Sequence, residues 1–138
     1  MKKGADSRPN LFAGKSSLKD IQDGLIVFNF KFLDPAQGQS FGEWEQEGLL
    51  SQAFDVFKNY SSQKMASSFS ERFKCYKGFP PGDKTEYQHP THVPEDAKWA
   101  SMHLQGEPCV IGHIHQNVFY VVFLDKNHKF WISELKHT

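Results

Sequence analysis

Apolar and polar residues alternate most clearly over residues 25–33. Three phenylalanines stand there at every second position, which is typical of a strand with one buried face. These are Phe28, Phe30 and Phe32. The alternation stops at Asp34-Pro35, and Gly38 follows between two glutamines, a composition that indicates a turn. We therefore predict a strand over 25–33, followed by a turn.

A helix start is indicated at Ser40, because Glu43 follows three residues later and the two side chains can satisfy free backbone N–H groups. The helix is expected to begin near Phe41 and to end near residues 60–62. Gly48 interrupts it, so the segment is either one kinked helix or two short ones. Its apolar series is predicted to pack on a sheet. The members of this series are Trp44, Leu50, Phe54 and Phe57.

The middle of the chain has less regular patterns. Residues 65–77 fit a short helix, or a strand over 72–76, equally well, and both alternatives stay open. Residues 78–96 carry prolines and glycines at a density that the interior of a helix or strand does not tolerate. We predict a long loop there, of a length that is usually functional or flexible.

The C-terminal third is rich in strand-forming residues. Alternation over 99–105 and 109–115, and a run of β-branched and aromatic residues over 118–124, predict three consecutive strands. Gln116-Asn117 suits a two-residue hairpin turn, since asparagine accepts a positive φ. Residues 130–135 fit a last edge strand or a helical turn.

That hairpin turn sets a register in which His115 pairs with Val118. One face of the hairpin is then wholly apolar and is predicted to meet the helices. It carries Val110, Gly112, Ile114, Phe119, Val121 and Phe123. The opposite face mixes polar aromatic and apolar side chains, and we expect it to be the functional face. It carries Cys109, Ile111, His113, His115, Val118, Tyr120, Val122 and Leu124.

Together these elements predict a single α+β domain. Its sheet is expected to be antiparallel, with about four strands and a helix or helical hairpin packed on one face. Residues 1–19 combine basic residues with Gly, Ser and Pro and hold few apolar side chains. They are predicted to be a flexible N-terminal arm in front of a domain over residues 20–138.

Composition narrows the class of protein. The 138 residues are 38% hydrophobic and 14% aromatic, which excludes a disordered chain. The 16 Lys and Arg balance the 16 Asp and Glu, so net charge exerts no overall attraction toward nucleic acid or membrane. The sequence lacks the run of about 18 apolar residues that a membrane helix needs. We therefore expect a cytoplasmic protein without membrane contact, and interpret Cys75 and Cys109 as reduced thiols.

Charge is spread unevenly although its sum is zero. Residues 34–55 carry five acidic and no basic side chains, whereas residues 58–77 carry five basic side chains and one acidic one. Within the basic segment Arg72, Lys74 and Lys77 are interleaved with aromatic residues. Such interleaving can supply stacking and phosphate contacts for RNA, so these three residues are the predicted RNA-binding set. The alternative is a solvated basic face over buried aromatic side chains.

The 7 histidines are more than average for a chain of this length. His113 and His115 would project from one sheet face, where two imidazoles can bind one metal ion. His103 could supply a third ligand only if the connection around Gly106 puts it on that face. The alternative is that these are half-exposed sheet histidines bonded to neighbours or water. We predict no cofactor, and His113 and His115 are the metal candidates that remain.

Residues Asp125 to Lys129 have the composition of a turn, since Asp and Asn side chains bond nearby backbone groups. A functional interpretation is also open. His128 could move a proton near neutral pH, while Lys126 and Lys129 hold a phosphate or stabilise developing charge. These three residues are the predicted catalytic group. The sequence has no phosphate-binding Gly-rich loop, nucleophile elbow, CxxC or HExxH motif, which argues against those enzyme classes.

From Gly106 to Trp131 the sequence GEPCVIGHIHQNVFYVVFLDKNHKFW, with the order strand, helices, loop and three strands, resembles the RelE/ParE toxin superfamily. The resemblance implies a helical hairpin on a short twisted sheet, ribosome-dependent cleavage of messenger RNA, and a small antitoxin protein as partner. It assigns His128, Lys129 and Trp131 to the tail that carries catalytic side chains. The chain departs from the family at Cys109 and Val110, where the characteristic arginine would fall.

Three functional hypotheses follow. The first is a RelE-like RNA-cleaving toxin, or an inactive relative of one, with RNA or the ribosome as partner. The second is a non-enzymatic binding or regulatory domain. The third is a small metal-dependent hydrolase that uses the sheet histidines.

Overall fold

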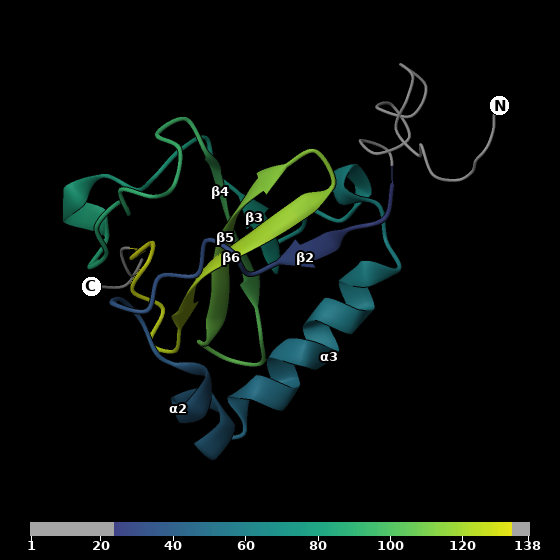
Figure 1. The fold of residues 1–138 in the computed structure, drawn as a ribbon, viewed down its shortest axis with the longest axis horizontal. Helices are drawn as coiled ribbons and strands as arrows, with labels where there is room; N and C mark the ends of the chain where they lie inside the picture. Colours follow the sequence, from purple (N-terminus) through teal and green to yellow (C-terminus); the bar gives the residue numbers. More distant parts are fainter. Residues whose placement is uncertain (1–23, 134–138) are drawn as a thin grey trace, which may run out of the picture.

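Five strands form one open sheet in the structure, a computed structural model that describes residues 24–133. The strand order is β2-β6-β5-β4-β3, and two helices lie along one side of the sheet (Figure 1). The predicted flexible arm over 1–19 lies outside the described residues. The strands are β2 (Val27–Asn29), β3 (Phe73–Cys75), β4 (Lys98–His103), β5 (Cys109–His115) and β6 (Val118–Asp125), and the helices are α2 (Phe41–Gln46) and α3 (Leu49–Ser61).

The predicted α+β class is confirmed, but the predicted antiparallel sheet of four strands is wrong. The sheet has five strands and is mixed, because β2 runs parallel to β6, with Val27 opposite Val118. The short strand β3 lies at the other edge, antiparallel to β4. Parallel strands need a long crossover instead of a tight turn, so turn residues in the sequence do not signal this pairing.

Strand β2 is shorter than the strand predicted over 25–33, because the chain turns directly after Asn29. The Asn29 Oδ1 atom accepts a hydrogen bond from the Lys31 backbone N–H at 2.8 Å. Beyond this turn, successive side chains no longer point to alternate faces of the sheet. Phe28 therefore packs with the helices, whereas Phe32 packs on the opposite side of the sheet.

The capping box predicted at Ser40 is present. The Ser40 Oγ atom accepts from the Glu43 N–H at 3.1 Å, and the Glu43 carboxylate accepts from the Ser40 N–H at 2.8 Å. Gly48 adopts a φ of 74° and separates α2 from α3. The chain therefore forms two helices, as one of the two alternatives predicted.

The predicted helix face is correct at Trp44 and Phe57, which are buried, and wrong at Phe54, which is 54% exposed. Helix α3 turns Ala53 and Phe57, four residues apart, toward the sheet. Phe54 follows Ala53 directly and is rotated about 100° around the helix axis from it. Leu50 is partly buried against the same core.

The hairpin of β5 and β6 has the predicted turn at Gln116-Asn117, with His115 opposite Val118. The positive φ of this turn, 57°, falls on Gln116 and not on the asparagine. The register set by the turn extends to Gly112 of β5.

Beyond Gly112 the predicted faces of the hairpin are wrong, because the register shifts at a bulge between Ile111 and Gly112. It gives β6 one extra residue, Val122, and side chains beyond a bulge change faces. Phe123 therefore leaves the face that meets the helices, and Leu124 joins it. The backbones approach closely here, because a Cβ atom on Gly112 would lie 2.1 Å from the nearest carbonyl oxygen of β6.

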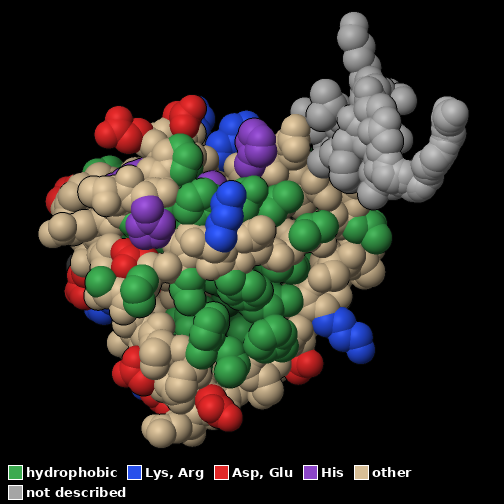
Figure 2. Space-filling view, viewed as in Figure 1, with side chains coloured by type: hydrophobic (Ala, Val, Ile, Leu, Met, Phe, Trp, Pro, Cys, Tyr) green, Lys and Arg blue, Asp and Glu red, His purple; other side chains and the backbone are tan. Residues whose placement is uncertain are grey.

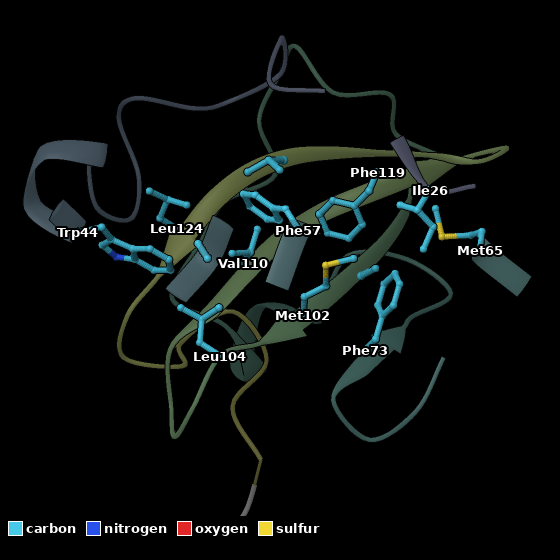
Figure 3. Packing of buried hydrophobic residues seen from close by; sticks show 13 residues of the cluster. Ile26, Trp44, Phe57, Met65, Phe73, Met102, Leu104, Val110, Phe119 and Leu124 are labelled. Atoms are coloured by element: carbon cyan, nitrogen blue, oxygen red, sulfur yellow. The ribbon is translucent and has the colours of Figure 1, made fainter. Parts of the chain in front are cut away.

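Apolar cores lie on both faces of the sheet. The first fills the space between sheet and helices, where Figure 3 shows Phe57 beside Phe119 and Trp44 beside Leu124. The second contains Trp99 and Phe123 and is covered by the segments that follow β3 and β6. The face that we expected to be functional is therefore largely a second core.

The structure also shows what the segments with less regular sequence patterns form. Residues 65–77 contain both a short 3₁₀ helix, Met65–Ser67, and the strand β3. The predicted loop over 78–96 is confirmed, with one 3₁₀ turn at Gly82–Lys84. Residues 130–133, the described part of the last predicted element, form neither strand nor helix. Within residues 24–133 every helix is too short or too polar to cross a bilayer.

Candidate functional site

Two histidines and a cysteine from three different segments meet at one end of the sheet. His103 is the last residue of β4, Cys109 is the first residue of β5, and the two lie opposite each other in the ladder. His128 reaches them from the turn after β6. One ligand atom from each residue lies within 4.8 Å of the other two. The Cys109 Sγ atom lies 3.6 Å from His103 Nδ1, and the two imidazole centroids are 5.2 Å apart.

The turn that carries His128 is fixed by a buried carboxylate at the end of β6. Asp125 accepts hydrogen bonds from the backbone N–H groups of Lys129, at 3.0 Å, and Phe130, at 2.9 Å. It also accepts one from the Tyr87 hydroxyl at 3.1 Å. His128 adopts a φ of 60° within this turn. The predicted turn is therefore present, and its aspartate bonds the nearby backbone as its composition indicated.

Burial is the main cause of the shifted pKa values of Cys109 and His103. It raises the pKa of the Cys109 thiol to about 12, with a smaller contribution from Asp125, so the thiol is protonated at neutral pH. Burial also lowers the pKa of His103, and the positive charges of His128, Arg72 and Lys74 lower it further. His103 is therefore held in its neutral form, which can accept a proton or bind a metal.

Two of the three predicted RNA-binding residues border this group. The Arg72 side chain donates to the Leu104 carbonyl, and the Arg72 carbonyl accepts from the His103 N–H at 2.8 Å. Lys74, exposed on β3, is close enough to affect the pKa of His103. Lys77 follows β3 toward the end of β4 that is remote from His103, because the two strands are antiparallel.

The predicted catalytic lysines contact carboxylates instead of the histidines. Lys126 forms an ion pair with Glu47, and the Lys129 Nζ atom lies 3.9 Å from a carboxylate oxygen of Glu86. Both pairs are partly exposed, so each contributes little to stability. Of the predicted catalytic group, only His128 lies in the three-residue cluster.

His113 and His115, the metal candidates from the sequence, occupy different environments. His113 is 4% exposed and stacks on Tyr120 with ring centroids 4.9 Å apart, whereas His115 is exposed. Within residues 24–133 only the cluster of His103, Cys109 and His128 brings three possible ligands together. Among those residues the His113 Nε2 atom is buried without a hydrogen-bond partner, and burial lowers the pKa of His113 to about 4.

His113 also lines a groove with a volume of about 800 Å³. Lys31 and Phe32, which follow β2, form one wall, and Lys98 of β4 lies on another. The groove is separate from the His103 cluster, since His113 and His103 belong to opposite ends of the β4–β5 ladder.

The pairing of His103 with Cys109 was missed from the sequence although a signal was present. The predicted strands over 99–105 and 109–115 flank Gly106, which adopts a φ of 80°. A hairpin centred on that glycine places His103 opposite Cys109 by symmetry. The approach of His128 had no comparable signal, because it depends on the contacts of Asp125.

No known protein family, curated protein or solved structure matches the chain significantly. The function therefore has to be argued from the residues of the site.

Proposed function

We propose that the chain is an RNA-cleaving enzyme of the RelE-like kind, with His103 and His128 as its reactive pair. The observation that carries the proposal is that two imidazoles face each other, with centroids 5.2 Å apart, beside the cations Arg72 and Lys74. RNA cleavage through the ribose 2′-hydroxyl needs a base, an acid and positive charge near the phosphate. These four side chains supply that set.

The environment of each imidazole suggests its role. His103 is assigned as the base that takes the proton of the 2′-hydroxyl, because its surroundings favour the neutral form. His128 is assigned as the acid that protonates the leaving 5′ oxygen. Arg72 and Lys74 stabilise the charge that develops on the phosphoryl oxygens. Lys126 and Lys129 flank the turn and pair with Glu47 and Glu86, so this proposal gives them no part in the chemistry.

An aromatic pair formed by the segments that follow β3 and β6 can receive a base. The rings of Tyr76 and Trp131 stack at 4.6 Å between centroids, with 14° between their planes. The Tyr76 hydroxyl lies 3.0 Å from Ser101 Oγ, and Ser101 shares its face of β4 with His103. We assign Tyr76 and Trp131 as the stacking surface for a nucleotide next to the cleaved bond, as aromatic side chains commonly serve in RNA recognition.

The test compares cleavage by the wild type and by His128→Ala, with free RNA and with messenger RNA on translating ribosomes. His128→Ala should lower the cleavage rate about 100- to 10,000-fold, which is the usual contribution of a general acid or base. His115→Ala is the matched control, since His115 is exposed and lies on the other end of β5. Intact RNA with the wild type, or equal cleavage by wild type and His128→Ala, would refute the proposal.

Lys74 and Lys77 of the basic segment should have different effects on RNA affinity. Lys74→Ala should weaken binding for all sequences and reduce the slope of log affinity against log salt by about 1, because one phosphate contact is lost. Lys77→Ala should change that slope much less, since Lys77 lies away from His103. Equal effects of the two substitutions would contradict the placement of RNA at this site.

The alternative hypothesis, a binding domain, is favoured by an exposed apolar patch between β2 and α3 (Figure 2). Phe30 contacts Phe41 and Phe57 at 6.1 and 5.9 Å between ring centroids, and Phe54 contacts Phe57 at 5.5 Å. The exposed members are Phe30, Phe41 and Phe54. Acidic residues of α2 and α3 surround the patch, so a protein partner with basic and apolar side chains fits it best.

This second candidate has its own test. If a small reading frame adjoins the gene, its product should bind the wild type and should bind Phe54→Asp at least about 10-fold more weakly, since loss of a hot-spot side chain costs about 2 kcal/mol or more. Wild-type binding with unchanged affinity for Phe54→Asp would exclude the patch as the binding surface.

A further inference from the structure

We infer that His103, Cys109 and His128 form a binding site for a zinc ion. Imidazole nitrogens and thiolates are ligands that zinc prefers, and zinc sites with three protein ligands of these kinds are common. The inference concerns binding of the metal. An imidazole bound to zinc cannot transfer the proton assigned to it in RNA cleavage, so cleavage is a property of the metal-free chain and is assayed on it.

The observed distance between two of the ligand atoms fits a tetrahedral zinc ion. Zinc lies about 2.3 Å from sulfur and about 2.0–2.1 Å from nitrogen, so two such ligands at the tetrahedral angle are about 3.6 Å apart. The Cys109 Sγ and His103 Nδ1 atoms are 3.6 Å apart. A thiol that merely donates to an imidazole would need no third group, yet a His128 nitrogen lies within 4.8 Å of the Cys109 sulfur and of a His103 nitrogen.

The fold holds these ligands in place before any ion binds. Ladder pairing of β4 with β5 fixes His103 and Cys109 opposite each other, and Cys109 is 1% exposed. The Asp125 carboxylate holds the turn of His128 through two backbone hydrogen bonds. Because the ligands come from two strands and one tied turn, binding requires only a small movement of His128.

The donor set selects the class of metal. Mg²⁺ and Ca²⁺ require oxygen ligands, and this cluster offers two nitrogens and one sulfur. Binding breaks the S–H bond of Cys109, releases its proton to solvent and forms the bond from sulfur to zinc, with no change of oxidation state. Three protein ligands leave the fourth tetrahedral position to a water molecule or another small ligand.

Arg72 and Lys74 partly oppose a cation at this place, and they also stabilise the thiolate that zinc requires. The thiolate, and Asp125 next to it, offset their charge. We therefore expect selective binding of zinc and of its spectroscopic substitute Co²⁺, and no binding of Mg²⁺.

The test titrates the full chain, first treated with a chelator, with Co²⁺ and then with Zn²⁺. The expected result is one Co²⁺ per chain, with the visible bands of tetrahedral cobalt and a near-ultraviolet band from thiolate to cobalt, all removed by one equivalent of Zn²⁺. Cys109→Ser should abolish the thiolate band, whereas Cys75→Ser should retain it, since Cys75 is the other, exposed cysteine.

The histidine ligands are tested by His103→Gln and His128→Gln, which keep a polar side chain of similar size. Each should weaken cobalt binding about 100-fold or more, because loss of an outer partner of a ligand alone costs about 10- to 100-fold. His115→Gln should bind like the wild type. Thermal unfolding without metal identifies any variant that has lost its fold, and the conclusion then rests on the other histidine and on Cys109→Ser.

Three results would overturn the inference: a folded wild type that fails to bind Co²⁺ in a 1:1 ratio, a thiolate band that survives Cys109→Ser, or unchanged binding by both histidine variants. If these results rule out the zinc site, the RNA-cleavage proposal is not affected. Conversely, failure of the cleavage test does not affect the metal titration, because the two assays measure different properties.

Discussion

Buried His113 should make the stability of the protein depend on pH in a defined window. An unfolded chain protonates this histidine near its ordinary pKa of 6.5, whereas the folded chain does so only near pH 4. The unfolded state therefore binds more protons between these values, and the contribution is fully present above pH 6.5 and is lost on acidification. Linkage gives a loss of about 2 kcal/mol at pH 5 and about 3 kcal/mol at pH 4.

The assay measures the free energy of unfolding by urea from about pH 8 to pH 4 for wild type and for His113→Gln, which cannot titrate. Groups that do not interact with His113 titrate equally in both proteins, so the difference between the two curves reports on His113 and its electrostatic interactions with His115, His89 and Lys31. The wild type should lose about 2–3 kcal/mol more than the variant over this range. His115→Gln, an exposed position on the same strand, should lose only slightly less than the wild type, because burial is the main cause of the lowered pKa of His113 and the charge of His115 a smaller one. Parallel curves for wild type and His113→Gln would show that the folded protein accepts a proton at this site without penalty.

Two further predictions concern packing. Gly112→Ala should destabilise the protein by about 3 kcal/mol, since its Cβ atom would meet a carbonyl oxygen at 2.1 Å, whereas Gly82→Ala has open space and should stay within about 0.5 kcal/mol in urea unfolding. Phe57→Ala should cost about 3–5 kcal/mol and Phe54→Ala less than about 1 kcal/mol, because only the first of the two is buried. Similar values for the two phenylalanines would mean that the orientation of α3 is wrong.

Local patterns in the sequence predicted the local structure well. The capping box at Ser40, the break at Gly48 and the register of the last hairpin each depend on residues within a few positions of one another. The exchange of faces at Phe123 could not be predicted in this way. It follows from a bulge opposite Gly112, and a strict period of two has no place for the extra residue.

The site was predictable in parts. His128 and the basic pair Arg72 and Lys74 were selected from composition, but their proximity depends on how β3 pairs with β4 and how Asp125 holds its turn. Lys126 and Lys129 were selected because they flank His128 in sequence. Neighbours in a turn point in different directions, and the structure pairs both lysines with distant glutamates.

The parallel pairing of β2 with β6 has a consequence for the order of folding. β6 lies between β2 and β5, and the pairing joins Val27 to Val118 across most of the described chain. Closing such a long loop is slow compared with forming the hairpins of β4, β5 and β6. During synthesis β2 leaves the ribosome early, but its partner strand emerges only after residue 118. We expect the hairpins to form first and β2 to join them last, so a chain stalled before β6 would present Phe28 and its neighbours to chaperones.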